Sequence, residues 1–269
     1  MTSDPPDGAY VWIWLPGQSK PIVAGLLSRS GKQFVFNYGQ SYLNRGDAIA
    51  IYHPELPLRA GHLPLLPGLT MPNCIRDGSP DAWGRRVIIN RLAGLENNEA
   101  AQFEPDELTY LIHSGSDRAG ALDFQQSPTV YVPRQGKNAS LEELLEATER
   151  VAAGTPLTPE LDEALRRGTS IGGARPKALV DAHDKKFIAK FSSRDDVYNV
   201  VKAELIAMRL AATLGLAVAR VELTKSLDKD VLLIERFDRP AADDGWYRTA
   251  MVSALTLLEL DGMMARYAS

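Results

Sequence analysis

The second half of the chain places a glycine-rich turn, a strand lysine and a helix glutamate in close succession. Gly172 and Gly173 begin a turn that runs to Lys177, and glycines without a Cβ let backbone amides approach phosphate oxygens. Lys190 follows in a segment where it alternates with apolar residues, and Glu204 lies fourteen residues further on. These residue types in this order indicate a phosphate-binding site, in which the glutamate orients the lysine.

Each of these signals alone has a simpler interpretation. Two glycines near Pro176 are typical of an ordinary β-turn, and the turn lacks the Lys-Ser or Lys-Thr pair of a Walker A loop. Lys190 could lie on the solvated face of an edge strand, and Glu204 could pair with Lys202 or Arg209 on its own helix. The common order and spacing of the signals favour the phosphate site.

An apolar run over residues 231–234 predicts a buried strand that leads into a short linker with acidic residues. In a phosphate-binding lobe the linker backbone could hydrogen-bond adenine, and an acid could reach the ribose. The simpler alternative is a strand that ends in a polar turn before Pro240. A glycine turn, a strand lysine, a helix glutamate and a linker are, in order, the parts of a protein-kinase amino-terminal lobe. The predicted ATP-binding residues are Gly172, Gly173, Ala174, Lys177, Lys190, Glu204, Glu235, Phe237 and Asp238.

The first part of the chain has the pattern of a small β-sheet. Four apolar or alternating segments, separated by turn residues, predict strands over residues 10–15, 22–27, 33–38 and 48–53. A further strand-like segment, 121–124, follows a tight loop over residues 114–120.

Helix start and stop signals predict four helices in the same region. Ser79 as N-cap and Pro80 at the first helical position begin a helix that ends at Gly94. Its core-facing residues are Trp83, Val87, Ile88 and Leu92. A short helix is predicted over residues 105–113, a helix with a Ser140–Glu143 capping box ends at Gly154, and another begins at residues 158–160 and ends at Gly168.

Two further segments carry apolar stripes at helical spacing. The helix that contains Glu204 ends at Gly215, and its stripe consists of Val197, Val200, Val201, Leu205, Met208 and Leu214. A second amphipathic stretch covers residues 253–268, with Leu255, Leu257, Leu258, Leu260, Met263 and Met264. Without a partner, this second stripe would expose an apolar surface.

The sequence therefore predicts an α+β fold of two parts. Residues 1–154 form a small β-rich amino-terminal subdomain with helices. Residues 155–269 form a lobe like the amino-terminal lobe of a protein kinase, with an antiparallel sheet and one long helix, and no carboxy-terminal lobe follows it.

Composition excludes several function classes. A net charge of −4 gives no general attraction to nucleic acid, so direct DNA binding is not expected. Cys74 is the single cysteine, and neither an export signal nor a membrane-spanning run of about 20 apolar residues is present, which indicates a cytoplasmic protein. The four histidines, His53, His62, His113 and His183, have no zinc-site spacing, and the sequence has no Gly-x-Ser-x-Gly hydrolase motif, so no metal site is expected.

Four sequence blocks resemble the HipA-type serine/threonine kinase toxins of bacterial toxin–antitoxin modules. Residues 78–86 resemble the family signature Pro-Asp-x-Trp-Gly-Arg-Arg, and residues 115–124 resemble its Gly-x-Asp-x-x-Gly-Ala-Leu block. Residues 170–177 are similar to its modified glycine-rich loop, and residues 234–239 to its linker. The blocks occur in family order and span nearly the whole chain.

The resemblance implies a kinase that uses ATP and Mg²⁺ to phosphorylate seryl or threonyl groups on a component of the translation machinery, of which glutamyl-tRNA synthetase is the known type. It also implies a helix-turn-helix antitoxin as partner, which supplies the DNA contact. The serine that the family autophosphorylates corresponds to Ser170. A phosphate there would place negative charge where the ATP phosphates bind and would switch nucleotide binding off.

The chain departs from the family in one respect. The family's Asp-x-x-His-x-x-Asn catalytic loop is absent, because no histidine follows His183 and no asparagine follows Asn199. No residue of this chain is therefore assigned to catalysis, and weak or no ATP binding and no phosphotransfer are expected from it alone. Two functions follow: the nucleotide-binding part of a kinase toxin, truncated in nature or in the recorded sequence, or a non-catalytic module that binds an antitoxin or a separate partner lobe.

Overall fold

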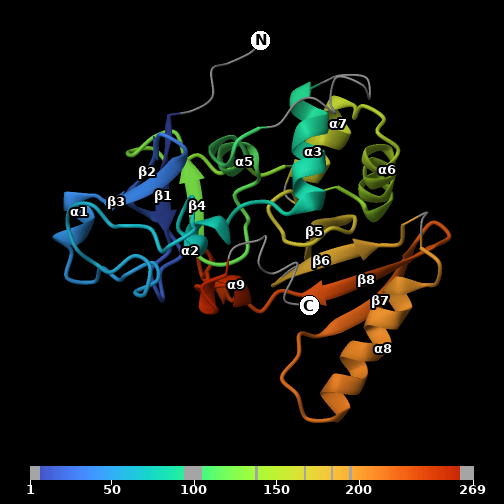
Figure 1. Cartoon of the computed structure of the whole chain (residues 1–269). Helices are drawn as coiled ribbons and strands as arrows, with labels where there is room; N and C mark the ends of the chain where they lie inside the picture. The colour runs from blue at the N-terminus through green and yellow to red at the C-terminus, as the bar shows by residue number, and fades with distance from the viewer. Residues whose placement is uncertain are drawn as a thin grey trace.

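Two antiparallel four-stranded sheets organise the part of the chain that the computed structural model describes, residues 7–93, 105–136, 139–166, 168–182, 184–193 and 196–260. The first sheet lies beside α5, and a layer of helices covers one face of the second sheet (Figure 1). A fold of mixed α and β structure with antiparallel sheets is therefore confirmed. None of the described helices is long and apolar enough to cross a membrane.

The first sheet has the strand order β3-β2-β1-β4. Its strands are β1 (Gly8–Ile13), β2 (Ile22–Ser30), β3 (Gln33–Tyr38) and β4 (Leu122–Gln125). Four strand predictions are thus confirmed, with small differences at the ends. The last strand joins from far along the chain and pairs with β1, so that Val11 lies opposite Phe124.

The predicted strand over residues 48–53 is wrong. Its backbone hydrogen-bonds tyrosine side chains instead of a neighbouring strand: the Ile51 N–H donates to Tyr38 Oη at 2.9 Å, and Tyr42 Oη donates to the Ile49 carbonyl at 2.9 Å. Tyr42 belongs to the short helix α1 (Gln40–Leu43), and its ring stacks on Tyr38. Because two tyrosine hydroxyls satisfy the backbone, the segment remains irregular although it is apolar.

The helix α3 (Ala82–Ala93) begins later than predicted, and Ser79 is not its N-cap. Ser79 instead donates its hydroxyl to Glu107 at 2.9 Å, and the first helical backbone bond runs from the Arg85 N–H to the Asp81 carbonyl. Because Glu107, in another helix, accepts the Ser79 hydroxyl, Ser79 does not cap α3. The predicted helix end, Gly94, lies outside the described residues.

The other predicted helices are confirmed. They are α5 (Glu107–His113), with Asp106 as N-cap, α6 (Leu141–Ala152) and α7 (Pro159–Arg166). The capping box of α6 is complete, since Ser140 accepts from the Glu143 N–H and Glu143 accepts from the Ser140 N–H. A further short helix, α2 (Asn73–Arg76), packs under the first sheet through Cys74 and Ile75.

The second sheet has the strand order β5-β6-β8-β7, with neighbouring strands antiparallel. Its strands are β5 (Lys177–Ala182), β6 (Lys185–Phe191), β7 (Val221–Ser226) and β8 (Lys229–Glu235). Ala189, Phe191 and Val231 face a core shared with α3, α6 and α7, while Leu232 faces the opposite helix α8. This core contains residues from both sides of the predicted boundary near residue 155, because α3 and α6 precede it.

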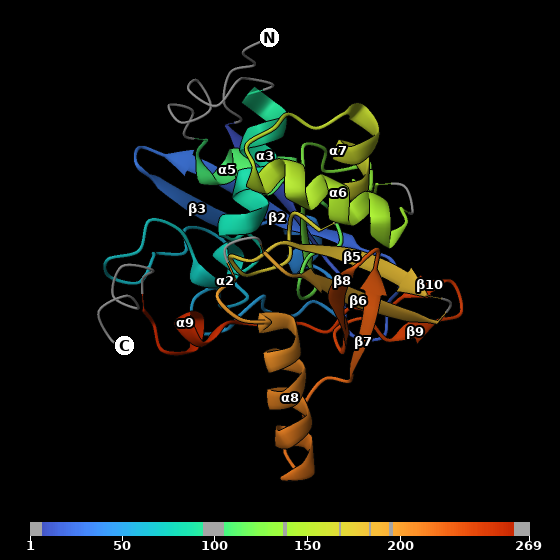
Figure 2. The same cartoon turned by 90° about the vertical axis from the view of Figure 1, so that its right-hand side faces the viewer.

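The helix α8 (Val200–Thr213) covers the second face of this sheet with only its first half. Val201 and Leu205 are buried, but Leu214 and Val197 from the predicted apolar stripe are 79% and 98% exposed. Only part of the predicted apolar stripe is therefore buried. The helix projects beyond the strands that it packs against, so its second half has no sheet beneath it (Figure 2).

The remaining elements are short. A hairpin of β9 (Ala241–Ala242) and β10 (Gly245–Trp246) follows the second sheet, and a single turn, α9 (Ala254–Leu257), ends the described chain. Leu257 and Leu258 are exposed, as the amphipathic stretch over residues 253–268 predicts. The rest of that stretch, including Met263 and Met264, lies outside the described residues.

Gly84 tests how tightly α3 packs on the glycine-rich turn. A Cβ at this position would lie 1.8 Å from the Thr169 carbonyl oxygen, which is backbone and cannot move aside as a side chain would. We expect Gly84→Ala to lower the free energy of unfolding by about 3 kcal/mol, the upper end of overpacking costs. Denaturant unfolding measures the change.

Gly46→Ala is the matched control, because a Cβ there meets nothing within 4 Å. Its effect should stay within about 0.5 kcal/mol. Equal stability of the two variants would contradict the close packing of α3 on the turn.

Candidate functional site

Lys190 and Glu204 form an ion pair between β6 and α8. The Lys190 ammonium donates to Glu204 Oε1 at 2.5 Å. Lys202, the alternative partner on the same helix, instead pairs with Asp230 at 3.0 Å. The side chains of Lys190 and Glu204 are 27% and 29% exposed, so a ligand can reach the pair from solvent.

Lys177 connects the glycine-rich turn to this ion pair. It lies directly opposite Lys190 in the β5–β6 ladder, and cross-strand partners project from the same face of a sheet. Its ammonium donates to the Gly173 carbonyl at 2.8 Å. Burial lowers the pKa of Lys177 to about 8, and the nearby charge of Lys190 lowers it as well. Two lysines therefore bring positive charge to the face on which the turn closes.

The turn requires glycine at Gly173 and is fastened by an aspartate that the sequence analysis did not assign to the site. Gly173 has a φ of +110°, which a residue with a side chain rarely adopts. Its N–H donates to Asp81 Oδ2, and a Cβ on Gly172 would lie 2.9 Å from the same oxygen. Asp81 thus places a carboxylate oxygen against the amide that a phosphate would use. Ala174 follows on the exposed side of the turn.

Ser170 precedes the turn and is 2% exposed. Its hydroxyl has no hydrogen-bond partner among the described residues. The preceding residue, Thr169, is held from both sides, since its hydroxyl accepts from the Gly115 N–H and donates to the Arg166 carbonyl, each at 2.8 Å. In this conformation Ser170 is inaccessible to another protein molecule.

The predicted linker residues do not join the lysines. Glu235 is the last residue of β8, not part of a linker, and it pairs with Lys185 at 2.9 Å. In the ladder it lies opposite Phe187, so its side chain projects from the face opposite Lys190. Phe237 is 67% exposed, while Asp238 is buried among arginines.

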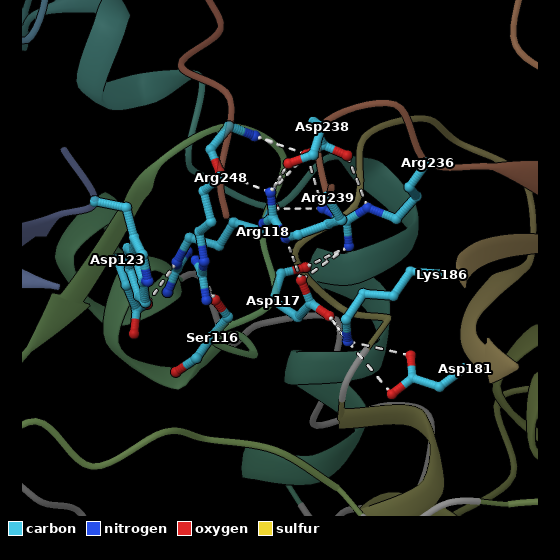
Figure 3. A network of polar contacts seen from close by, with 12 residues as sticks. Ser116, Asp117, Arg118, Asp123, Asp181, Lys186, Arg236, Asp238, Arg239 and Arg248 are labelled. Atoms are coloured by element: carbon cyan, nitrogen blue, oxygen red, sulfur yellow. Dashed lines mark hydrogen bonds and ion pairs between the residues drawn. The ribbon is translucent and has the colours of Figure 1, made fainter. Parts of the chain in front are cut away.

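A buried ionic network joins the loop over residues 114–120 to the end of β8 (Figure 3). Asp117 Oδ1 accepts from Arg236 at 3.0 Å and from Arg239 at 2.8 Å, and its Oδ2 accepts from Lys186 at 2.9 Å. Asp238 accepts from the same two arginines and from the Gly120 N–H. Both carboxylates therefore accept several hydrogen bonds from basic side chains of the protein.

Arg118 extends this network toward the first sheet. It is completely buried, pairs with Asp123 at 2.8 Å and donates to the Gly78 carbonyl at 2.6 Å. Its own carbonyl accepts from Arg236 at 2.7 Å. Each of the four sequence blocks that carried the family resemblance thus contacts another block.

The charges of the network depend on one another. Burial alone would raise the pKa of Asp117, but Arg236, Arg239 and Lys186 lower it far below its ordinary value. Burial lowers the pKa of Arg239 to about 10, and the adjacent Arg236 contributes to that effect. Asp117 is therefore ionised at all ordinary pH values, and the basic groups around it depend on its negative charge.

Sequence reasoning missed the structural roles of Asp81, Asp117, Arg118, Arg236 and Arg239. All five lie within the sequence blocks, but a charged residue is ordinarily expected at a solvated surface. The burial of Asp117, Arg118, Arg236 and Arg239 shows that they are paired inside the protein, and the role of the exposed Asp81 follows from its hydrogen bond to the Gly173 N–H.

Comparisons with known proteins give one consistent result. A family model described as the HipA N-terminal domain matches residues 13–125, and one described as the HipA-like C-terminal domain matches residues 169–269. The solved Shewanella oneidensis MR-1 complex of HipA, HipB and operator DNA contains a chain of similar fold, with a TM-score of 0.58 and 22% sequence identity. The similarity covers 94% of this chain and 57% of that one. No curated protein matches this chain.

Asp117→Asn should strongly destabilise the protein, because three basic side chains would lose the charge that compensates them. Removing one partner of a buried ion pair costs about 3–5 kcal/mol. The free energy of unfolding from urea titration measures this, and the exposed Asp47→Asn, which breaks a surface pair with Arg45, should change it by less than about 1 kcal/mol.

The pH dependence gives the same variant a second measurement. A carboxyl whose pKa is depressed on folding stabilises the native state above its unfolded pKa, and the stabilisation is lost as pH falls. The free energy of unfolding of the wild type should therefore decrease as pH falls below about 4. The free energy of unfolding of Asp117→Asn should decrease less steeply over the same pH range. Identical acid dependence in the two proteins would contradict the role of Asp117.

Proposed function

This chain belongs to the HipA family, and from that premise we propose that it carries the nucleotide-binding part of a HipA-type serine/threonine kinase toxin. The observation that supports this most is the Lys190–Glu204 pair beside a glycine turn, on a four-stranded antiparallel sheet with one long helix. Protein kinases use a strand lysine held by a helix glutamate to position the phosphates of ATP. The proposal thus assigns a chemical role to a partly exposed ion pair between β6 and α8.

The residues present fit the phosphate groups of ATP. Lys190 would contact the α- and β-phosphates while Glu204 holds its ammonium in place, and Lys177 would add a second positive charge. When bound, ATP would supply the γ-phosphoryl group for transfer to a seryl or threonyl hydroxyl. Among the described residues no cluster of three or more acidic, histidine or cysteine side chains is suited to a metal ion, so ligands for Mg²⁺ are not assigned.

Asp81 sets the condition under which the turn can bind phosphate. In the conformation described here, its carboxylate accepts from the Gly173 N–H, and a phosphate oxygen would repel it. The turn must therefore exchange Asp81 for the phosphate when nucleotide binds. Breaking the bond to Asp81 costs free energy, and Asp238 is already bonded to two arginines and the Gly120 N–H and not to a ligand. Both features support the proposal that this chain alone binds nucleotide weakly.

A non-catalytic binding role is the second candidate, and the exposed apolar half of α8 favours it. Leu210 is 58% exposed there, and Ile206, at the middle of the helix, is 57% exposed. The sequence lacks the Asp-x-x-His-x-x-Asn loop, so we propose binding without phosphotransfer by this chain alone. The related HipA occurs in a complex with HipB and operator DNA, and we propose a helix-turn-helix antitoxin as the partner of this chain.

Lys190→Ala should weaken the binding of ATP or a non-hydrolysable analogue about 10- to 100-fold, the value of one hydrogen bond between charged groups. Isothermal titration calorimetry measures the dissociation constant. Lys202→Ala is the matched control, because Lys202 lies on the same helix as Glu204 but pairs with Asp230. Its affinity should equal that of the wild type.

If the wild type binds no nucleotide, this chain alone lacks the proposed nucleotide-binding function. If Lys190→Ala and Lys202→Ala bind equally, the nucleotide site is not at Lys190. Circular dichroism of all three proteins excludes unfolding as the cause.

Co-expression with a helix-turn-helix protein, if one is encoded beside this chain, tests the antitoxin proposal. We expect the two proteins to elute together in size-exclusion chromatography, at the mass of a complex that contains a whole number of copies of each protein. Separate elution of two folded proteins at micromolar concentration would contradict the proposed partner, whatever the outcome for ATP.

A further inference from the structure

A small cavity lies where the first sheet meets the β9–β10 hairpin, and none of the predicted nucleotide-binding residues lines it. Its volume is about 210 Å³. Three aromatic rings, those of Trp14, Tyr131 and Trp246, line it, together with Lys186, Arg239, Arg248 and Asp117. The Asp117 carboxylate is paired with Lys186 and Arg239. Aromatic walls combined with basic groups are suited to an anion with an apolar or planar body.

Arg248 differs from the other two basic residues of the cavity. Lys186 and Arg239 both pair with Asp117. The Arg248 guanidinium stacks at 3.4 Å from the centre of the Trp14 ring and donates one hydrogen bond, to the Ser116 carbonyl at 3.0 Å. No carboxylate among the described residues lies within ion-pair distance of it. A guanidinium has five N–H donors, so Arg248 retains donors for a ligand.

The surroundings carry more positive than negative charge. Among the described residues, the network of Figure 3 and its immediate ion-pair partners contain six basic and four acidic side chains, two positive charges more than negative. The basic residues are Arg118, Arg134, Lys186, Arg236, Arg239 and Arg248, and the acidic ones are Asp117, Asp123, Asp181 and Asp238.

An excess of charge in a largely buried cluster destabilises it, because the low dielectric there weakens screening. An anion next to Arg248 would reduce the excess at the one basic group that has no carboxylate. Burial already lowers the pKa of Arg248, which an anion would oppose.

We propose that this cavity is a binding site for a small oxyanion, a carboxylate or phosphate group, held by the Arg248 guanidinium and flanked by the Trp14, Tyr131 and Trp246 rings. Guanidinium groups bind such oxyanions with two parallel hydrogen bonds. With a volume of about 210 Å³, the cavity accommodates a small organic acid or a phosphorylated small molecule.

Titration of the full chain with inorganic phosphate, and separately with succinate, tests the proposal. Because Trp14 and Trp246 line the cavity, binding should change the tryptophan fluorescence and raise the melting temperature beyond the effect of sodium chloride at equal ionic strength. Phosphate binding without succinate binding would identify a phosphate site, and the reverse result a carboxylate site. If neither anion exceeds the sodium chloride control, the proposal is wrong.

Three variants locate the effect. Arg248→Gln should weaken anion binding at least 10-fold, whereas Arg45→Gln, which removes an exposed arginine paired only with Asp47, should leave it unchanged. Trp246→Ala, in the half-exposed hairpin, removes a wall without touching the arginine and should weaken binding by a smaller factor; it also serves if Arg248→Gln does not fold. Full binding in a folded Arg248→Gln protein, or in Trp246→Ala if only that variant folds, would overturn the assignment.

Lys190→Ala separates this site from the proposed nucleotide site. The variant should keep the phosphate effect, because Lys190 does not line the cavity. Loss of the effect in Lys190→Ala would place the phosphate at the glycine turn and remove the support for the cavity site.

Discussion

The Asp117 carboxylate is the group on which the arrangement of the two sheets depends. It belongs to the loop that leads into β4 of the first sheet, and it binds Lys186 of β6 and two arginines that follow β8. The two arginines lie more than a hundred residues after Asp117 in the sequence, yet all four groups are almost completely removed from water. A buried charge must be compensated locally, so any relative shift of the two sheets would separate charges at a high energetic cost.

The glycine-rich turn is held by a second set of contacts that also come from the first half of the chain. The Trp83 indole donates to the Lys177 carbonyl, Gly84 packs against Thr169, and the Gly115 N–H bonds the Thr169 hydroxyl. The position of the turn is thus determined by α3 and by the loop that precedes β4. By contrast, the Lys190–Glu204 pair needs only β6 and α8, which are neighbours in sequence.

The candidate site therefore has one part that is already formed and one part that would have to rearrange to bind a phosphate. The ion pair is already formed and partly exposed, whereas the turn is closed by Asp81 and by the Lys177 ammonium. The excess positive charge of the ionic network lies elsewhere, toward the cavity that Arg248 lines. The fold therefore presents positive charge in two separate places, in spite of the negative net charge of the chain.

Features that depend on near neighbours along the chain could be predicted from the sequence. Strand alternation in β6, the capping box of α6 and the fourteen-residue spacing from Lys190 to Glu204 are local patterns, and the structure has all three. Ser79 and residues 48–53 were misassigned because Glu107 and two tyrosine hydroxyls bond them from other elements. The side-chain direction of Glu235 and the burial of Asp238 were likewise decided by the β6–β8 register and by the arginines. Local propensity acts within a few residues, whereas the partner of a charged side chain depends on which distant segments the fold brings together.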